Sequence, residues 1–81
     1  MSNLSRLRRT FSDALGMGEQ EITETLTYAS VPKWDSLAHM GLVAAIEKEF
    51  GIMMDTDDVI DMSSFSKARE ILKKNGVNLD A

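Results

Sequence analysis

A short stretch in the middle of the chain, Trp34-Asp35-Ser36-Leu37-Ala38-His39, contains the residue types of a nucleophilic active site. A serine nucleophile needs a base, and His39 follows Ser36 by three residues, a spacing that puts both on one helical face. A hydrolase also needs an oxyanion hole and a sharp nucleophile turn, of the kind a Gly-x-Ser-x-Gly motif supplies. The sequence has neither that motif nor a glycine-rich donor loop. We therefore expect His39 to be a surface or half-buried residue and the chain not to be an enzyme.

A cluster of acidic residues invites a test for calcium: Asp55, Asp57, Asp58 and Asp61. An EF-hand loop starting at Asp55 would need a ligand at Val59, a glycine at Ile60 and a glutamate at Ser66. All three positions fail. Because the chain has no cysteine and only one histidine, disulfides, thiolate sites and histidine-rich sites are also excluded. We expect no metal site and assign the aspartates to helix capping and a partner surface.

Two roles remain open for Ser36. Either Asp35 or Ser36 is a good N-cap for the apolar helix that follows. Capping alone does not explain the long loop before Ser36, the neighbouring Trp34 or the acidic residues after it. A phosphodiester is stabilised at a helix N-terminus by free backbone N–H groups and the helix dipole, and a separate transferase would do the chemistry. Covalent attachment of a phosphate-bearing group is therefore the functional hypothesis beside the cap.

The elements that position these residues are all predicted to be helical. Apolar spacings of three and four predict helices over about 3–16, 36–50 and 64–75, with a short helical turn at about 57–61. The expected fold class is all-α: one domain over 1–81, a small antiparallel four-helix bundle with three main helices and a short third one. A long loop over 17–35 joins the first two helices. We predict no strand in it and expect four apolar side chains to pin it to the bundle: Ile22, Leu26, Tyr28 and Val31.

Capping residues and apolar faces give these helices their expected ends and orientation. The expected N-caps are Ser2 or Asn3, Thr56, and Ser63 or Ser64, and the expected ends are Gly16, Gly51 and Gly76. The apolar face predicted for 36–50 is Leu37, Met40, Val43, Ala44, Ile46 and Phe50; the last helix should bury Phe65, Ala68, Ile71 and Leu72. Gly41 costs a helix about 1 kcal/mol relative to alanine. We expect it to admit another helix or to leave room for a bound group.

The distribution of charge indicates which partners the chain meets. Residues 35–61 carry seven acidic residues against one lysine. Such a segment repels nucleic acid, which needs clustered lysine and arginine, and attracts partners with a basic surface. The apolar runs are too short to cross a membrane, and residues 1–15 lack the apolar core of a signal peptide. We expect a cytoplasmic monomer without membrane insertion.

The segments "WDSL", "LVAAIEKEFGI" and "DTDDVIDMSSFSKAREIL" together resemble an acyl carrier protein over nearly the whole chain. This resemblance implies that Ser36 carries 4'-phosphopantetheine, added from coenzyme A by a phosphopantetheinyl transferase. The arm's thiol would hold an acyl group as a thioester and present it to acyl-loading and acyl-transferring enzymes. Asp35 would position Ser36 and the transferase, and Leu37 would anchor the helix start and contact partners.

The resemblance also assigns surface and core residues. It implies partner-binding residues at Met40, Glu47, Glu49, Asp57 and Asp58. It implies an acyl cavity between the helices, lined by Met40, Ile46, Met62 and Ala68, although ordinary core packing explains the same apolar positions equally well.

The chain departs from the carriers of fatty acid biosynthesis near Ser36. A small residue usually precedes Asp-Ser-Leu, where this chain has Trp34, and acidic residues usually follow, where it has Ala38 and Gly41. The Gly-Gly-His-Ser motif of peptidyl carriers is absent. We expect a discrete carrier in a specialised lipid, polyketide or surface-polymer pathway. The alternative is an unmodified helical interaction module that uses its acidic face.

Overall fold

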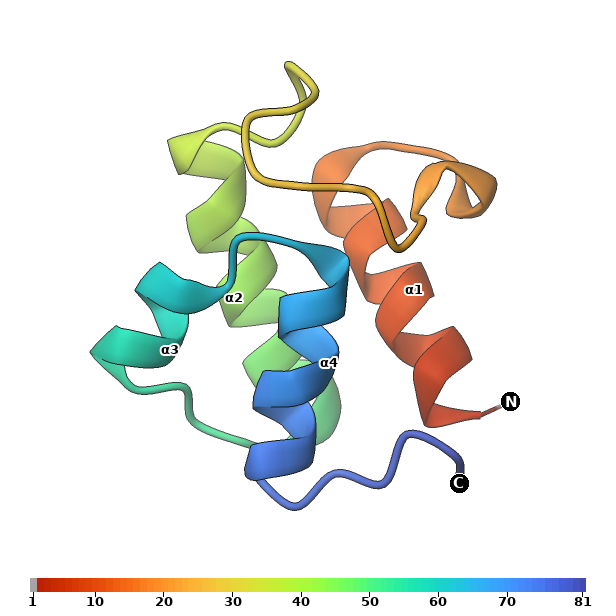
Figure 1. Cartoon of the computed structure of the whole chain (residues 1–81), viewed down its shortest axis with the longest axis vertical. Coiled ribbons are helices and arrows are strands. Elements are labelled where there is room, and N and C mark those ends of the chain that lie inside the picture. The colour runs from red at the N-terminus through yellow and green to blue at the C-terminus, as the bar shows by residue number, and fades with distance from the viewer. Residues whose placement is uncertain (1) are drawn as a thin grey trace.

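The computed structural model describes residues 2–81, which form four α-helices and one 3₁₀ turn. The elements are α1 (Asn3–Leu15), η1 (Glu19–Glu21), α2 (Ser36–Phe50), α3 (Thr56–Asp61) and α4 (Phe65–Lys74). Figure 1 shows α1 and α2 running in opposite directions, while the short α3 returns the chain so that α4 runs in the same direction as α2. The predicted fold, a small all-α bundle with a long loop after its first helix, is confirmed.

Polar caps set the helix ends. The hydroxyl of Ser2 accepts a hydrogen bond from the Ser5 N–H, and that of Ser64 from the Lys67 N–H, as two of the expected caps require. The expectation of Thr56 as the cap of α3 was wrong, because Thr56 is already the first helical residue. Asp55 is the cap, and its carboxylate accepts from the Asp58 N–H at 2.8 Å. An aspartate also favours the positive helix N-terminus electrostatically.

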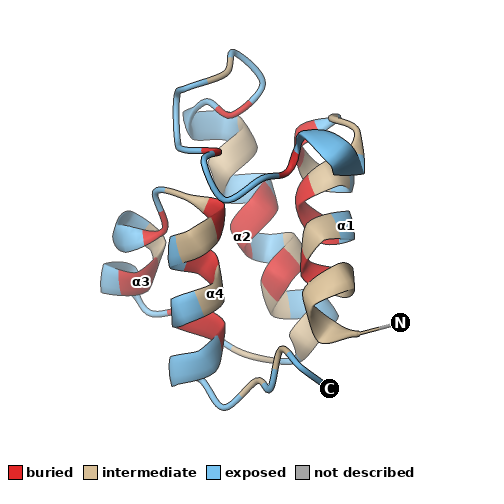
Figure 2. Ribbon diagram, turned by 45° about the vertical axis from the view of Figure 1, so that its right-hand side comes forward, coloured by how far each residue is buried: buried red, intermediate tan, exposed pale blue. Residues whose placement is uncertain are grey.

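The core lies between α1, α2 and α4, where Figure 2 shows the buried stripes of these helices facing inward. At its centre, the Phe11 ring meets Trp34 and Phe65 edge-on, with ring centroids 5.5 and 5.1 Å apart. Such edge-to-face pairs add to the free energy gained by burying the rings. The last helix buries the four residues predicted for it: Phe65, Ala68, Ile71 and Leu72.

The predicted apolar face of α2 was only partly correct. Val43 and Ile46 are buried, together with Leu42, but Ala44 is exposed and Leu37 and Met40 are 82% and 59% exposed. Apolar residues occur all round the first half of this helix, so their spacing does not select one face. Among residues 2–81, no other helix packs closely against Gly41, contrary to one expectation, because the space where a side chain would begin has no neighbouring atom within 4 Å outside its own helix backbone.

The predicted side chains fix the loop between α1 and α2 to the bundle to different degrees. Ile22 and Leu26 are buried, Val31 is half-buried and packs against the core, and Tyr28 is 41% exposed but contacts the Trp34 ring edge-on. The loop also pairs with the start of α4. The Tyr28 N–H donates to the Ser63 carbonyl at 2.7 Å, and the Phe65 N–H donates to the Leu26 carbonyl at 3.2 Å. These bonds form an isolated bridge between Thr27 and Ser64 instead of a strand.

The two ends of the chain lie side by side at the end of the bundle away from the start of α2 (Figure 1). The backbone N–H groups of Asn3 and Leu4 donate to the carbonyls of Ala81 and Leu79, at 2.7 and 3.2 Å. These two N–H groups belong to the first turn of α1, which has no partners within the helix. The C-terminal tail therefore satisfies the start of the first helix.

Candidate functional site

Ser36 lies at the first position of α2, where the long loop ends. The cap is Asp35, whose Oδ1 accepts a hydrogen bond from the Ala38 N–H at 2.9 Å. Because Asp35 does the capping, the Ser36 hydroxyl is not needed for it, and the Ser36 side chain is exposed. Helix geometry leaves the first N–H groups of α2 without intrahelical partners. An exposed hydroxyl thus stands at the positive end of a helix of 15 residues.

His39 does not form a nucleophilic pair with Ser36. Its Nδ1 accepts a hydrogen bond from Trp34 Nε1 at 3.0 Å, and its Nε2 bonds to the Val59 carbonyl oxygen at 2.8 Å. Both ring nitrogens therefore have partners other than the serine. His39 is half-buried, as expected, whereas Trp34 is 0% exposed. Sequence reasoning missed this contact, although the only tryptophan and the only histidine of the chain lie five residues apart.

Exposed apolar side chains flank Ser36. Leu37 and Met40 lie on the first turns of α2, and Ile60, on α3, is 72% exposed. Ile60 follows Val59, whose carbonyl bonds to His39, so α3 brings it close to the same part of α2. Large exposed apolar side chains that gather at one place mark interaction sites more often than scattered ones do. Ile60 was not among the predicted partner-binding residues.

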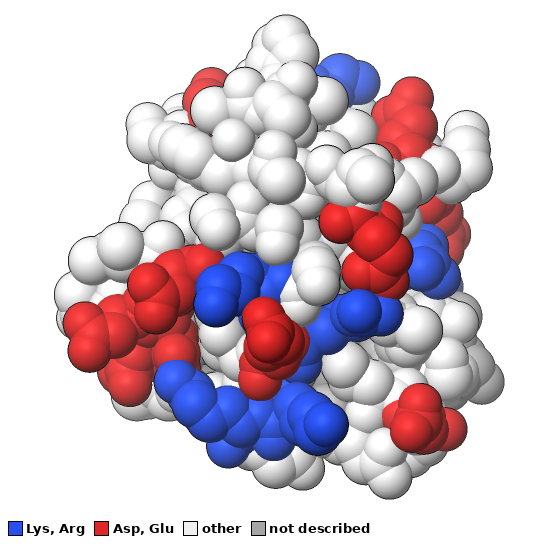
Figure 3. All heavy atoms as spheres, in the orientation of Figure 1, with Lys and Arg blue, Asp and Glu red and all other residues white. Residues whose placement is uncertain are grey.

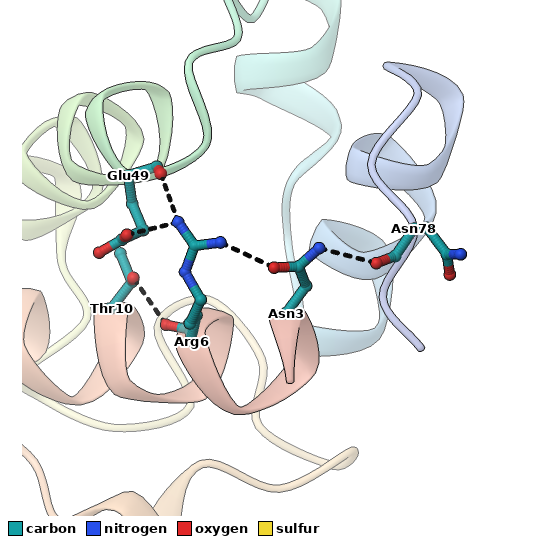
Figure 4. Close-up of polar contacts among 5 residues, drawn as sticks. All are labelled: Asn3, Arg6, Thr10, Glu49 and Asn78. Atoms are coloured by element: carbon teal, nitrogen blue, oxygen red, sulfur yellow. Dashed lines mark hydrogen bonds and ion pairs between the residues drawn. The ribbon is translucent and has the colours of Figure 1, made fainter. Parts of the chain in front are cut away.

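The two glutamates of α2 make contacts within the chain. Glu47 accepts a hydrogen bond from the Met54 N–H at 2.8 Å and so fixes the turn that leads into α3. Glu49 pairs with Arg6, whose Nη2 donates to its Oε2 at 2.7 Å and to its carbonyl oxygen at 2.9 Å (Figure 4). Glu49 lies 13 residues beyond Ser36, which is about 20 Å along a helix. Its charge is therefore partly balanced and far from Ser36.

Arg6 also connects the ends of the chain. Its Nη1 donates to Asn3 Oδ1 at 2.7 Å, and Asn3 Nδ2 donates to the Asn78 carbonyl at 2.8 Å (Figure 4). In the same view, the Thr10 hydroxyl donates to the Arg6 carbonyl at 2.8 Å. This network joins α1, α2 and the C-terminal tail at the end of the bundle opposite Ser36.

The two aspartates predicted on α3 have different surroundings. Asp57 is exposed, but Asp58 is 3% exposed and forms an ion pair with Lys74 of α4. The Asp58 hydrogen bond, more than its charge and those of Asp55 and Asp61, raises the pKa of Lys74 above its ordinary value. Asp58 therefore departs from the expectation for a partner contact, because it is buried and paired within the chain. Figure 3 shows the acidic surface over α3 beside the basic surface over α4.

Of the four residues assigned to an acyl cavity, three belong to the buried core, whereas Met40 is 59% exposed and lies outside it. Ile46, Met62 and Ala68 are each 1% exposed. A cavity of about 570 Å³ lies elsewhere, between the start of α1, the end of α4 and the C-terminal tail. Within residues 2–81, no group of three or more histidine, aspartate or glutamate side chains is placed to hold a metal ion. In the same part of the chain, no helix is long and apolar enough to span a membrane.

Comparison with known protein families identifies the chain. A family model described as the phosphopantetheine attachment site matches residues 5–72. The chain belongs to this family. It is a phosphopantetheine-binding carrier protein, such as an acyl carrier protein, and its cofactor is covalently attached 4'-phosphopantetheine, on which acyl groups are held.

The start of α2 fits this cofactor. A phosphodiester needs an accessible hydroxyl and a site that stabilises negative charge. The carrier offers the exposed Ser36 side chain at a helix N-terminus, which provides both. When bound, the group supplies a flexible arm with a terminal thiol. That thiol can form a thioester, which the chain itself cannot do because it has no cysteine.

Proposed function

We propose that Ser36 is the attachment residue and that the carrier presents acyl thioesters to a series of partner enzymes. The observation that carries this proposal is the division of roles at the start of α2. Asp35 holds the helix turn, while Ser36 stays exposed at the positive helix end. A phosphopantetheinyl transferase would supply the base and transfer the group from coenzyme A. The carrier would therefore need no catalytic residue of its own, which agrees with both His39 nitrogens being engaged elsewhere.

We further propose that partners dock around Ser36 on α2 and α3. Leu37, Met40 and Ile60 supply exposed apolar contacts, and the exposed Asp57 supplies negative charge for a basic partner. Glu47 and Glu49 remain secondary contacts because both are engaged within the chain. Complementary charge of this kind raises the association rate more than the affinity.

We propose a specialised pathway, in lipid, polyketide or surface-polymer synthesis, rather than the common fatty acid synthase. The support is the uncharged surface beside Ser36, where Leu37, Met40, Gly41 and Ala44 are all exposed. A partner evolved for an acidic α2 would find no charges on these turns. The compartment consistent with this role is the cytoplasm, and the carrier would act as a monomer.

We also propose that the acyl chain enters the core between α2 and α4. Ile46, Met62 and Ala68 are fully apolar and buried, and they come from α2, from the end of α3 and from α4. An acyl chain that parted these helices would exchange water for apolar contacts along its length.

Modification of Ser36 separates the carrier from an unmodified interaction module. Incubation with coenzyme A and a promiscuous phosphopantetheinyl transferase should add one phosphopantetheine group to the wild-type chain, as measured by intact mass. Ser36→Ala should abolish the gain completely. Ser63→Ala is the matched control, since Ser63 is also exposed in a segment before a helix, and it should be modified like the wild type. An equal gain for Ser36→Ala, or none for the wild type, would refute the proposal.

A further inference from the structure

Two side chains close to Ser36 tie its helix turn to other parts of the bundle. Trp34 lies two residues before Ser36 and His39 three residues after it. The indole N–H of Trp34 donates to His39 Nδ1, and His39 Nε2 bonds to the Val59 carbonyl in α3. The planes of the two rings are inclined by only 21°, and their centroids lie 6.1 Å apart. The chain Trp34–His39–Val59, which we call the imidazole link, thus joins the loop, α2 and α3.

The partners of His39 fix its protonation state. An indole N–H only donates a hydrogen bond, and a carbonyl oxygen only accepts one. Nδ1 must therefore be unprotonated and Nε2 must carry the hydrogen, which is the neutral imidazole. A protonated imidazole has a hydrogen on both nitrogens. Its Nδ1–H would face the Trp34 N–H, and that half of the link would be lost.

The imidazole link acts on a short helix whose apolar attachment to the core is Val59, which is half-buried. α3 has six residues, of which only Asp58 is buried, and Ile60 is 72% exposed. Polar contacts hold α3 and its approach to the bundle: Lys74 with Asp58, Glu47 with the Met54 N–H, and His39 with the Val59 carbonyl. Of these side chains, histidine is the type that changes charge between pH 5 and 8. The link therefore differs from the other two contacts in its response to mild acid.

We propose that His39 is a positioning residue that, in its neutral form, holds the Ser36 turn of α2 against Trp34 and α3 and releases this connection when protonated. The proposal rests on the proposed function only where it concerns modification of Ser36. The release of the link is a property of the chain itself, with or without the cofactor.

The groups around His39 are compatible with a neutral link. The titratable residues of the loop that lie nearest to it in sequence are Tyr28, Lys33 and Asp35, and those of α3 are Asp57, Asp58 and Asp61. The Tyr28 ring meets the imidazole edge-on at 5.5 Å, the Asp35 carboxylate caps α2, Lys33 bonds to the Gly16 carbonyl, and Asp58 pairs with Lys74. Among residues 2–81, no carboxylate forms an ion pair with His39. Neutral hydrogen bonds, rather than a counter-charge, therefore hold the ring.

Nuclear magnetic resonance tests the link directly, because the chain has one histidine and one tryptophan. The sample is the unmodified Ser36→Ala chain, so the result does not depend on cofactor attachment. At pH 8, the ring nitrogen shifts should show Nδ1 unprotonated and Nε2 protonated. Between pH 8 and 5, the indole N–H resonance should lose its hydrogen-bonded shift with the same midpoint as the His39 ring. The opposite tautomer, or an indole resonance that does not follow His39, overturns the proposal.

The consequence for Ser36 is tested with two variants and the transferase. Trp34→Phe keeps an aromatic ring but removes the indole N–H, and His39→Gln removes the group that titrates. In both, amides of the first α2 turns should exchange about fivefold faster at pH 8, the factor expected from one lost hydrogen bond of ordinary strength. The ratio of the wild-type transfer rate to the His39→Gln rate should fall as the pH is lowered from 8 to 5.5. A constant ratio overturns the positioning role; failure of every chain to be modified instead refutes the proposed function.

Should His39→Gln not fold, the wild-type transfer rate is divided by the Trp34→Phe rate instead. In Trp34→Phe, protonation of His39 Nδ1 breaks no hydrogen bond, because the indole donor is absent. This ratio should again fall as the pH is lowered, because only the wild-type chain loses a contact. Equal pH profiles for the wild type and Trp34→Phe count against the link.

Discussion

Adjacent residues at the start of α2 divide two tasks that the sequence alone could not separate. Asp35 accepts the Ala38 N–H, and Ser36 is left exposed. Serine and aspartate are equally good caps, so their types did not decide which one acts. The backbone decides, because Asp35 has an extended conformation, with φ −102° and ψ −173°, and Ser36 is already helical. Position, more than residue type, therefore leaves the Ser36 hydroxyl outside the capping role.

This division predicts unequal effects of two neighbouring substitutions on stability. Asp35→Ala should lower the free energy of unfolding by about 1 kcal/mol, because the first turn of α2 loses its cap. Ser36→Ala should change it by less than about 0.5 kcal/mol, as for other exposed positions. Urea unfolding followed by circular dichroism measures both. The capping assignment would be wrong if Ser36→Ala were the more destabilising of the two.

At the scale of elements, α3 differs from the other helices in what holds it. α1, α2 and α4 bury apolar stripes, whereas α3 buries a carboxylate that pairs with Lys74. Periodicity predicted the three long helices because a stripe of buried residues leaves a repeating pattern. It could not predict the attachment of α3, since the Asp58–Lys74 pair and the imidazole link join residues 16 and 20 positions apart. The apolar face of α2 was predicted only in part for a related reason, because apolar residues near Ser36, such as Leu37 and Met40, are exposed.

The ion pair between α3 and α4 predicts how stability changes at alkaline pH. Because the Asp58 hydrogen bond raises the pKa of Lys74 in the folded chain, this lysine binds its proton more tightly when folded than when unfolded. Its contribution to stability is therefore complete below the pKa of the unfolded lysine and is lost as the pH rises through the raised value.

Thermal unfolding in alkaline buffers tests that contribution. Lys74→Arg should keep its stability to higher pH than the wild type, because arginine stays charged there. Lys74→Gln should be less stable than the wild type near neutral pH and should lack the alkaline loss attributable to this pair. Identical alkaline profiles for all three chains would rule out Lys74 as the titrating group.

At the scale of the whole molecule, charge is separated between neighbouring helices. The acidic residues over α3 lie beside lysines and arginines over α4 (Figure 3). The sequence predicted this excess of negative charge over residues 35–61, but not which carboxylates are available. Asp58 and Glu49 have partners within the chain, whereas Asp57 is exposed. Only the folded chain distinguishes a surface charge from a structural one.

Reversal of one exposed charge tests the partner face. Asp57→Lys should slow acyl transfer by a cognate basic partner about tenfold or more at low ionic strength, since steering contributes factors of this size. The difference should shrink in high salt, which screens exposed charges. Asp80→Lys is the matched control, because Asp80 is an exposed aspartate in the C-terminal tail, and it should leave the rate unchanged. A similar loss for both variants would mean that net charge, not the α3 surface, governs association.

The pairing of the C-terminal tail with the first turn of α1 determines where a fused polypeptide or a solid support would be attached to the carrier. Asn3 and Ala81 are linked by a backbone hydrogen bond at the end of the bundle away from the start of α2. A polypeptide fused to either end, or a support to which the chain is anchored there, would therefore leave from one pole of the molecule. Ser36, at the opposite end of the bundle, would stay accessible to partners. The fold therefore separates the two chain ends, at one end of the bundle, from the start of α2 at the other.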